Sequence, residues 1–510
     1  MTMTNEILVA GSCLSIVVLF GVTAYILHRK FSKVDQSLHF FLTARNTLPW
    51  YKVAGGFYAA SIGAAVLFAA PSIVADIQNP GGYISLIVYA VASGLPFIVI
   101  AYCGVYIKNR FPDGTSIGSF ARWRFGPFFE LWVTINVLLT LGILLAVEYT
   151  AIGSIYYRFL GIEPWIPISI IATVTMIYTG LGGLSISLIT DQIQSIFIVL
   201  LLGIVGVFVA THFDTTLPPL PDYLGVTDIG RGSILTFGIS TFSSTMFSDA
   251  IWQRVWAAES DQALFTGAYC GGFLVTLVTL IFGFGGYLAA WAGLVTDPNL
   301  AFLELLKTGT PPIIPLSMLM TICLIATLMN EAAVDSYQIA IGDCMLSLSE
   351  SFGYKPSIKS LRILLVLINI PFALIGCFDL KVISLYLMSY LMATCLIIPL
   401  MMGMIPALDS IITGSSALFG SFFGLFCIFA YGICDTYRGE WNWLDVTHGV
   451  YKTFYGHINW PPFFVGLVGS LMGMIIYSSI EVGLFRYRLD LDVCKLENSP
   501  LLHEDDLGHN

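Results

Sequence analysis

Apolar segments of about 20 residues or more follow one another along most of this chain, separated by short polar stretches. A strand of a transmembrane barrel needs only about 10 residues, whereas a spanning helix needs about 20. Because only helices and closed barrels satisfy their backbone hydrogen bonds in hydrocarbon, the pattern predicts an all-α polytopic membrane protein with about thirteen transmembrane helices. The predicted spans are residues 7–27, 51–72, 83–107, 126–157, 164–182, 185–211, 233–252, 264–293, 314–344, 361–378, 382–407, 413–434 and 461–485.

The positions of the basic residues support this number of spans. With the N-terminus outside, 16 of the 22 Lys and Arg residues fall in inside loops or at the adjoining helix ends, and the outside receives the remaining six. A missed or invented helix would reverse this bias in every later loop, because inside loops are the basic ones. The sequence therefore predicts an N-terminus outside and a C-terminus in the cytoplasm.

Composition excludes several classes of function. The chain is 57% hydrophobic and 11% charged, whereas a soluble domain is about 25% charged. A net charge of -10 argues against nucleic acid as a partner. The ten cysteines are scattered singly, so we expect neither a disulfide framework nor a cysteine metal site.

No sequence motif points to an enzyme. The sequence contains no ATP-binding P-loop and no pattern that pairs a nucleophile with a base. Energy for any pumping would therefore come from an ion gradient or from a partner chain, with no cofactor. The expected partners are a small-molecule solute, a coupling cation and the lipid bilayer, and the sequence indicates no oligomeric state.

Small residues interrupt the second predicted span between Ala54 and Ala65, a stretch that includes Gly55, Gly56 and Gly63. Transporters with central sites break helices near the midplane, so that half-helix dipoles and freed carbonyls can hold an ion. Small residues also let helices pack closely, and this alternative stays open for any single glycine.

Two further blocks of sequence carry a family resemblance. Tyr178 to Gly183 reads as a Tyr-Thr-x-x-Gly-Gly turn, and Thr190 to Gln194 follows as a Thr-Asp-x-x-Gln helix start. A second block, Trp252 to Ala258, lies at the inner end of the seventh span. Together they resemble the signature of the sodium:solute symporters. Within that family, these blocks, residues 57–63 and the Ala-Arg-Asn-Thr stretch at 44–47 resemble the urea active transporters of fungi and plants.

The resemblance implies a leucine-transporter-type inverted repeat of five plus five helices, preceded by one extra helix. The repeats would cover about residues 51–211 and 233–407, within one transmembrane transporter domain over 1–485. A cytoplasmic acidic tail at 486–510 is predicted to be disordered. The plasma membrane is the implied location.

The resemblance also implies where solute and ions would bind. The solute would lie between the broken second and seventh spans, where Tyr58 and Trp252 stand at the positions of aromatic gates. Sodium would lie where Ala60 and Gly63 face the ninth span. Asp191 matches an aspartate thought to help ion passage, although its position also suits a helix N-cap.

The ninth span departs from the family pattern, because the usual adjacent hydroxyls are missing. Thr327 and Asn330 lie three residues apart on one helix face and could supply oxygens for a sodium ion. Glu331 and Asp335 lie four apart on one face, with no Lys or Arg in the same helix. Such a pair suits proton or cation coupling; the alternative is a permanently protonated pair hydrogen-bonded to neighbouring Ser, Thr or Tyr side chains.

Glu148 in the fourth span also lies in apolar surroundings. The urea transporters have a similar Ala-Glu-Leu element in this helix, which implies a role with substrate or in coupling. The alternative is a structural hydrogen bond to Tyr149 or to another helix.

The sequence therefore predicts an ion-coupled symporter that works by alternating access, for urea or a related small polar nitrogen compound. Sodium and proton coupling are both open, and the missing hydroxyl pair with Glu331 and Asp335 favours protons. The alternatives are a family member for another solute, such as a sugar, a polyamine or choline, and a transport-inactive sensor with the same fold.

Overall fold

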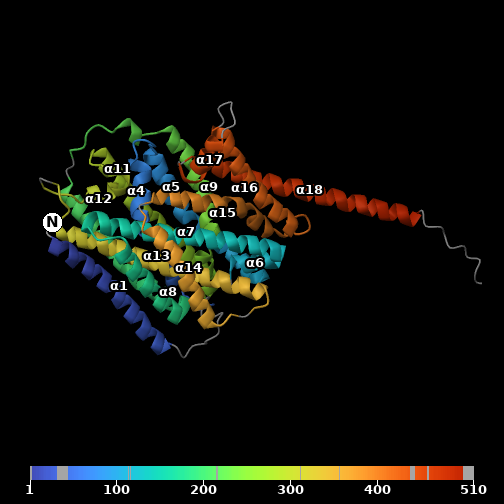
Figure 1. The fold of residues 1–510 in the computed structure, drawn as a ribbon, viewed down its shortest axis with the longest axis horizontal. Helices are drawn as coiled ribbons and strands as arrows, with labels where there is room; N and C mark the ends of the chain where they lie inside the picture. The colour runs from blue at the N-terminus through green and yellow to red at the C-terminus, as the bar shows by residue number, and fades with distance from the viewer. Residues whose placement is uncertain are drawn as a thin grey trace, which may run out of the picture.

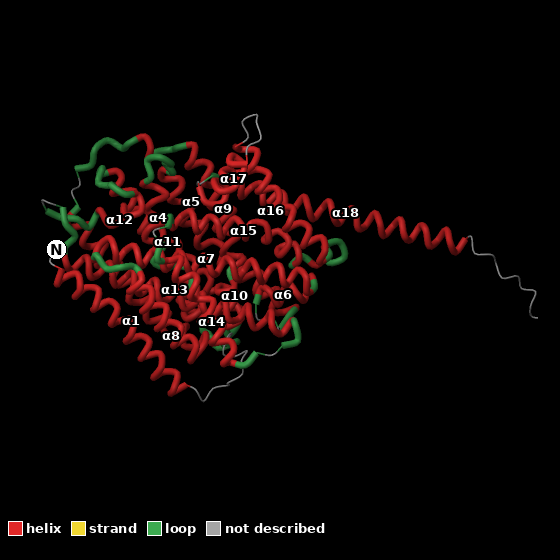
Figure 2. Tube along the Cα trace, in the orientation of Figure 1, coloured by secondary structure: helices red, strands yellow, loops and turns green. Residues whose placement is uncertain are grey.

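The computed structural model describes residues 3–31, 44–112, 114, 116–213, 216–309, 312–354, 356–378, 380–436, 443–456 and 459–497. Helices make up nearly all of this part of the chain, and they pack into one bundle (Figures 1 and 2). Ten of the described helices are long and apolar enough to cross a membrane. The predicted class, an all-helical polytopic membrane protein, is confirmed. The helices are α1 (Met3–Phe31), α3 (Trp50–Ala59), α4 (Val66–Ala75), α5 (Gly82–Arg110), α6 (Ile117–Phe125), α7 (Pro127–Leu160), α8 (Trp165–His212), α9 (Asp228–Phe247), α10 (Asp249–Ala257), α11 (Asp261–Trp291), α12 (Ala301–Glu304), α13 (Leu316–Ser351), α14 (Ile358–Gly376), α15 (Val382–Gly403), α16 (Gly414–Thr436), α17 (Trp443–Tyr451) and α18 (Pro461–Glu497).

Two of the predicted spans are interrupted helices. The second span is divided into α3 and α4, with residues 60–65 between them outside either helix. The seventh is divided into α9 and α10 at Ser248, whose ψ of 111° is extended. The interruption predicted from the small residues of the second span is confirmed.

The fifth and sixth predicted spans are joined more closely than the sequence indicated. They form the single 48-residue run α8, and Gly183 interrupts the helical backbone within it at φ 59° and ψ −153°. A residue with a side chain rarely adopts this conformation, so the glycine of the Gly-Gly turn is needed there. The predicted turn is therefore a kink.

Burial separates the central helices from those that face lipid. In the most apolar stretch of α13, 78% of residues are buried, against 17% in α14. The second half of α8 exposes a stripe of large apolar side chains, as expected for contact with acyl chains. This stripe consists of Ile196, Phe197, Val199, Leu200, Ile204 and Val207.

The segment before α3 pairs with the end of α10. Thr47 and Leu48 donate their backbone N–H groups to the carbonyl of Ala257, each at 2.9 Å, and Glu259 donates back to Leu48 at 2.9 Å. Leu48 and Ala258 form an isolated parallel bridge. The beginning of α3 and the end of α10 are thus held together by two of the segments that carry the family resemblance.

The C-terminal helix is longer than the predicted last span. α18 runs to Glu497 and extends beyond the bundle (Figure 1). Residues 486–497 of the predicted tail therefore lie in this helix, and the rest of the tail, 498–510, lies outside the described residues.

Candidate functional site

A cavity lies between the two interrupted helices, near the middle of the chain's helical bundle. The space open to the centres of water-sized spheres in it is about 70 Å³, and one water needs about 10–15 Å³ on this measure. Eight of the described helices contribute to its wall, namely α4, α5, α7, α9, α10, α11, α13 and α15, together with residues of both interruptions. The lining residues are Ala60, Ser61, Ile62, Val66, Tyr89, Ser93, Leu144, Thr241, Ser244, Thr245, Ser248, Ile251, Val275, Thr279, Tyr337, Tyr386 and Tyr390.

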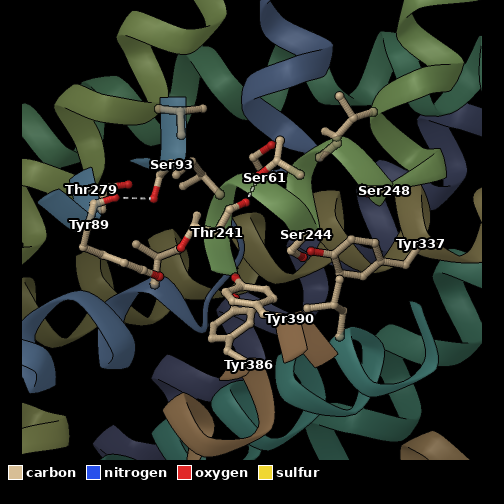
Figure 3. Close-up of a pocket in the computed structure, with 17 residues that line it drawn as sticks. Ser61, Tyr89, Ser93, Thr241, Ser244, Ser248, Thr279, Tyr337, Tyr386 and Tyr390 are labelled. Atoms are coloured by element: carbon tan, nitrogen blue, oxygen red, sulfur yellow. Dashed lines mark hydrogen bonds between the residues drawn. The ribbon is translucent and has the colours of Figure 1, made fainter. Parts of the chain in front are cut away.

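Hydroxyl groups dominate the polar part of this wall. Serine, threonine and tyrosine side chains converge on the cavity from several helices (Figure 3). None of the described residues that line it carries a charged side chain. Because each hydroxyl can both donate and accept, the wall suits a small uncharged solute that carries donors and acceptors of its own.

Glu148 lies directly against the first interruption. A Cβ atom added to Gly63 would stand only 2.1 Å from Oε1 of Glu148, so a glycine is required for this close approach. The N–H of Ala65, at the start of α4, donates weakly to Oε2 of Glu148 at 3.4 Å. The side chain of Glu148 is fully buried.

Two other helices also donate to Glu148. Nδ2 of Asn330 on α13 lies 2.7 Å from the carbonyl oxygen of Glu148 and 3.3 Å from its Oε2. The hydroxyl of Tyr386 on α15 donates to Oε1 at 3.3 Å. Tyr149 instead donates to Asn369, at 2.7 Å. Glu148 is therefore hydrogen-bonded to other helices, one of the two structural alternatives for this residue, and not to Tyr149.

A second buried polar cluster lies between α8, α10 and α13. Nη2 of Arg254 lies 3.1 Å from Oδ2 of Asp191, and both side chains are 0% exposed. The same nitrogen donates to the hydroxyl of Ser336 at 2.7 Å, and the hydroxyl of Tyr178 donates to Asp335 at 2.8 Å. The ninth span lacks a basic residue of its own, as the sequence showed, but α10 supplies one.

The structure excludes the helix N-cap as the role of Asp191. It also places Glu331 near the same cluster. Asp191 lies inside α8, beyond the kink at Gly183, so it is not a helix N-cap. Glu331 is fully buried on the same face of α13 as Asp335, and neither of its carboxyl oxygens has a hydrogen-bond partner among the described residues. Asp191, Glu331 and Asp335 are therefore brought to one region of the structure.

The candidate sodium ligands are only partly brought together. Asn330 reaches the first interruption through Glu148. The hydroxyl of Thr327 donates to the carbonyl of Cys323 at 2.6 Å and lies 3.0 Å from the hydroxyl of Tyr156. Within the described part of the chain, no group of three or more His, Cys, Asp or Glu residues is arranged to hold a metal ion.

The two aromatic residues expected at gates do not line the cavity. Tyr58 is buried in α3, and Nε1 of Trp252 donates to the carbonyl of Met246 at 2.8 Å. Four tyrosines that the sequence did not indicate line the cavity instead, namely Tyr89, Tyr337, Tyr386 and Tyr390. The signals that could have found part of this wall were the Ser/Thr-rich run at 240–248 and the i, i+4 spacing of Tyr386 and Tyr390.

No family model matches the chain. A curated relative, Spermidine transporter DUR31 of Candida albicans, is 25% identical over 400 residues, which cover 77% of this chain and 74% of that protein. The fold is similar to that of a Na⁺-coupled sialic acid symporter in a substrate-bound outward-open state. The TM-score is 0.68 at 15% identity, over 93% of this chain and 98% of that one. In sequence and in fold the chain is thus similar to transporters, in agreement with its resemblance to the sodium:solute symporters.

These similarities support the resemblance seen in the sequence. A second solved structure with a similar fold is MHP1, a nucleobase-cation-symport-1 family transporter in a closed conformation with bromovinylhydantoin bound. Its TM-score is 0.57 at 12% identity, over 86% of this chain and 94% of that one. At these identities the two structures establish a common fold, that of the leucine-transporter type.

Proposed function

We propose that this chain is an ion-coupled symporter that imports urea, or a related small polar nitrogen compound, by alternating access. The observation that carries the proposal is the cavity between the two interrupted helices, with its hydroxyl-rich wall and no charged lining residue among those described. A buried polar solute must have its hydrogen bonds satisfied. Urea offers one carbonyl acceptor and two amide donor groups, which the serine, threonine and tyrosine hydroxyls can match.

The order of the helices supports an inverted repeat of five plus five. One repeat would run from the interrupted helix α3/α4 to the end of α8, and the other from the interrupted helix α9/α10 to α15. Each repeat thus begins with an interrupted helix, and α1 precedes both. Counting α8 as two crossings divided at Gly183 gives the proposed thirteen, with an outside N-terminus in the plasma membrane.

A second, larger cavity supports entry from the outside. It has about 370 Å³ open to the centres of water-sized spheres and lies at the end of α4 and the beginning of α15. Ser72 and Ser384 of its wall are on the same two helices as Val66 and Tyr386 of the central cavity. In the proposed topology these helix ends face outside, so solute would enter here.

Two sets of residues are candidates for coupling. The backbone at Ala60 and Gly63, with Thr327 and Asn330, is the candidate sodium site, and the cluster around Asp191, Glu331 and Asp335 is the candidate for ion passage or proton coupling. We favour protons, because the hydroxyl pair expected of a sodium site is missing. Coupling to one cation would make urea import electrogenic, at about 2.3 kcal/mol per charge for each 100 mV.

The second candidate solute is a polyamine, because the relative in Candida albicans is a spermidine transporter. A polyamine carries several positive charges and would favour carboxylates around it. The carboxyl group of Glu148 lies behind the cavity wall, where it accepts from the hydroxyl of Tyr386. Uptake of labelled urea and labelled spermidine by cells that express the chain separates the two candidates.

The role of the cavity is tested with Thr241, whose hydroxyl has no hydrogen-bond partner among the described residues. Thr241→Val keeps the shape of the side chain and removes that hydroxyl from the wall. If it contacts the solute, the KM for urea should rise about fivefold to thirtyfold, for a lost hydrogen bond of about 1–2 kcal/mol. Thr211→Val, at the exposed end of α8, is the matched control.

The outcomes separate the proposals. An unchanged KM in Thr241→Val would remove the cavity as the urea site. Accumulation of spermidine alone would favour the polyamine transporter. Retained binding of a solute that never accumulates would favour a transport-inactive sensor.

A further inference from the structure

The outer half of the first interrupted helix begins at the edge of the central cavity. Ile62 and Val66, on either side of this beginning, both line the cavity. The first N–H groups of a helix have no partner within the helix, and the helix dipole adds about half a positive charge there. In transporters with interrupted helices, such half-helix N-termini attract anionic groups of the solute.

Here the protein supplies an anionic group of its own. The carboxyl of Glu148 on α7 lies against Gly63 and accepts from the N–H of Ala65, at the beginning of α4. Asn330 and Tyr386 complete the set of donors. These donors face the carboxyl oxygens at 3.3–3.4 Å, and donors in such positions favour the ionised form of a carboxyl group over the neutral form. None of the described lysines or arginines forms an ion pair with it.

We propose that Glu148 sets the charge selectivity of the cavity by occupying the anion position at the beginning of α4. Its carboxylate takes the place that the carboxylate of an anionic solute would need, and it makes the potential in the cavity negative. The cavity would therefore exclude anionic solutes and accept neutral or cationic ones. This inference rests on the proposed function in one respect, that the cavity binds the solute.

Tyr386 links the carboxylate to the solute. Its ring lines the cavity, while its hydroxyl donates to Oε1 of Glu148 at 3.3 Å. The charge is thus one side chain away from a bound solute. A fully buried charge in a medium of low dielectric constant is felt over such a distance, because no water screens it. Glu148 would act through Tyr386 and through the beginning of α4, as a positioning and selectivity residue.

The test uses three probes of similar size and different charge on the purified full-length protein: urea, the acetamidinium cation and the oxamate anion. Their dissociation constants are measured by titration calorimetry for the wild type and for Glu148→Gln. The control is Glu130→Gln, another buried carboxyl of α7, which pairs with Arg122 at 3.1 Å and does not line the cavity. Urea uptake by the same proteins is measured separately.

The wild type should bind acetamidinium at least tenfold more tightly than oxamate. Glu148→Gln should shift this ratio at least tenfold towards oxamate, whereas Glu130→Gln should keep the wild-type ratio. A merely structural role for Glu148 would weaken all three probes together and leave the ratio unchanged.

The inference is overturned if the ratio is equal in the wild type and Glu148→Gln, or if Glu148→Gln does not bind oxamate. If that variant does not fold, the dissociation constants of the wild type still test the proposal. Wild-type protein that binds oxamate as tightly as acetamidinium would contradict it. Failure of urea uptake with the expected binding ratios would count against the proposed function and leave the charge selectivity in place.

Discussion

The contact between Gly63 and Glu148 gives the sharpest prediction for stability. A Cβ atom at Gly63 would lie 2.1, 2.3 and 2.4 Å from Oε1, Cδ and Oε2 of Glu148, whereas real Cβ contacts essentially never fall under 3.0 Å. Gly63 does not have a positive φ, so alanine meets no backbone strain there. In Gly63→Ala the carboxyl must therefore move away, and its hydrogen bonds to Asn330 and Tyr386 are disturbed.

The expected cost follows from three terms. Overpacking a well-packed interior costs about 1–3 kcal/mol. The weakened hydrogen bonds from Asn330 and Tyr386 add about 1 kcal/mol each. Alanine recovers about 0.4–1 kcal/mol, because it restricts the unfolded chain more than glycine does. Gly63→Ala should thus lower the free energy of unfolding by about 2–5 kcal/mol.

The assay is denaturant unfolding of the purified protein in detergent, followed by tryptophan fluorescence. Gly238→Ala is the control, because nothing lies within 4 Å of the Cβ position there. Glu148→Asp shortens the acid by one methylene group and should restore about 2 kcal/mol to the Gly63→Ala protein, as a coupling energy. Wild-type stability in Gly63→Ala, or additivity of the two changes, would refute the reasoning.

Two further predictions concern the contacts around α10. Asp191→Asn leaves the buried guanidinium of Arg254 without its carboxylate, so the free energy of unfolding should fall by about 3–5 kcal/mol. The control is Asp228→Asn, which breaks an exposed ion pair. A loss under about 1 kcal/mol for Asp191→Asn in the same unfolding assay, or an equal loss for the control, would contradict this prediction. The double substitution Leu48→Cys and Ala258→Cys should form a disulfide between two segments that are already bridged. Because we expect these segments to move together, urea uptake should stay at the wild-type rate. Uptake that is abolished by oxidation and restored by reductant would show that they separate.

Much of the fold could be predicted from the sequence, because the bilayer requires long apolar helices with basic inside ends. The interruption of the second span was also indicated, because several small residues cluster between Ala54 and Ala65, although close helix packing could have explained any one of them. The continuous run of α8 was missed, because a Gly-Gly pair is compatible with both a loop and a kink. Only the tertiary structure shows that Gly183 alone interrupts the helix.

The site was less predictable, because helical periodicity indicates which residues share a face but not which helix lies opposite. The pairing of Arg254 with Asp191 joins residues 63 positions apart, and that of Tyr386 with Glu148 joins residues 238 apart. The sequence singled out Glu148 as an acidic residue in apolar surroundings. It did not indicate the tyrosines of the cavity wall, because tyrosine is common throughout this chain, with 24 residues.

The central claim, that this chain concentrates a small polar solute with the energy of an ion gradient, is tested most directly in proteoliposomes. Labelled urea is supplied outside, and an inward sodium gradient or an inward proton gradient is imposed in separate experiments at a fixed membrane potential. The account predicts that one of these gradients, the proton gradient by preference, drives urea inside to a concentration above that outside. Urea that enters only until the two concentrations are equal under both gradients, or does not enter at all, would contradict it.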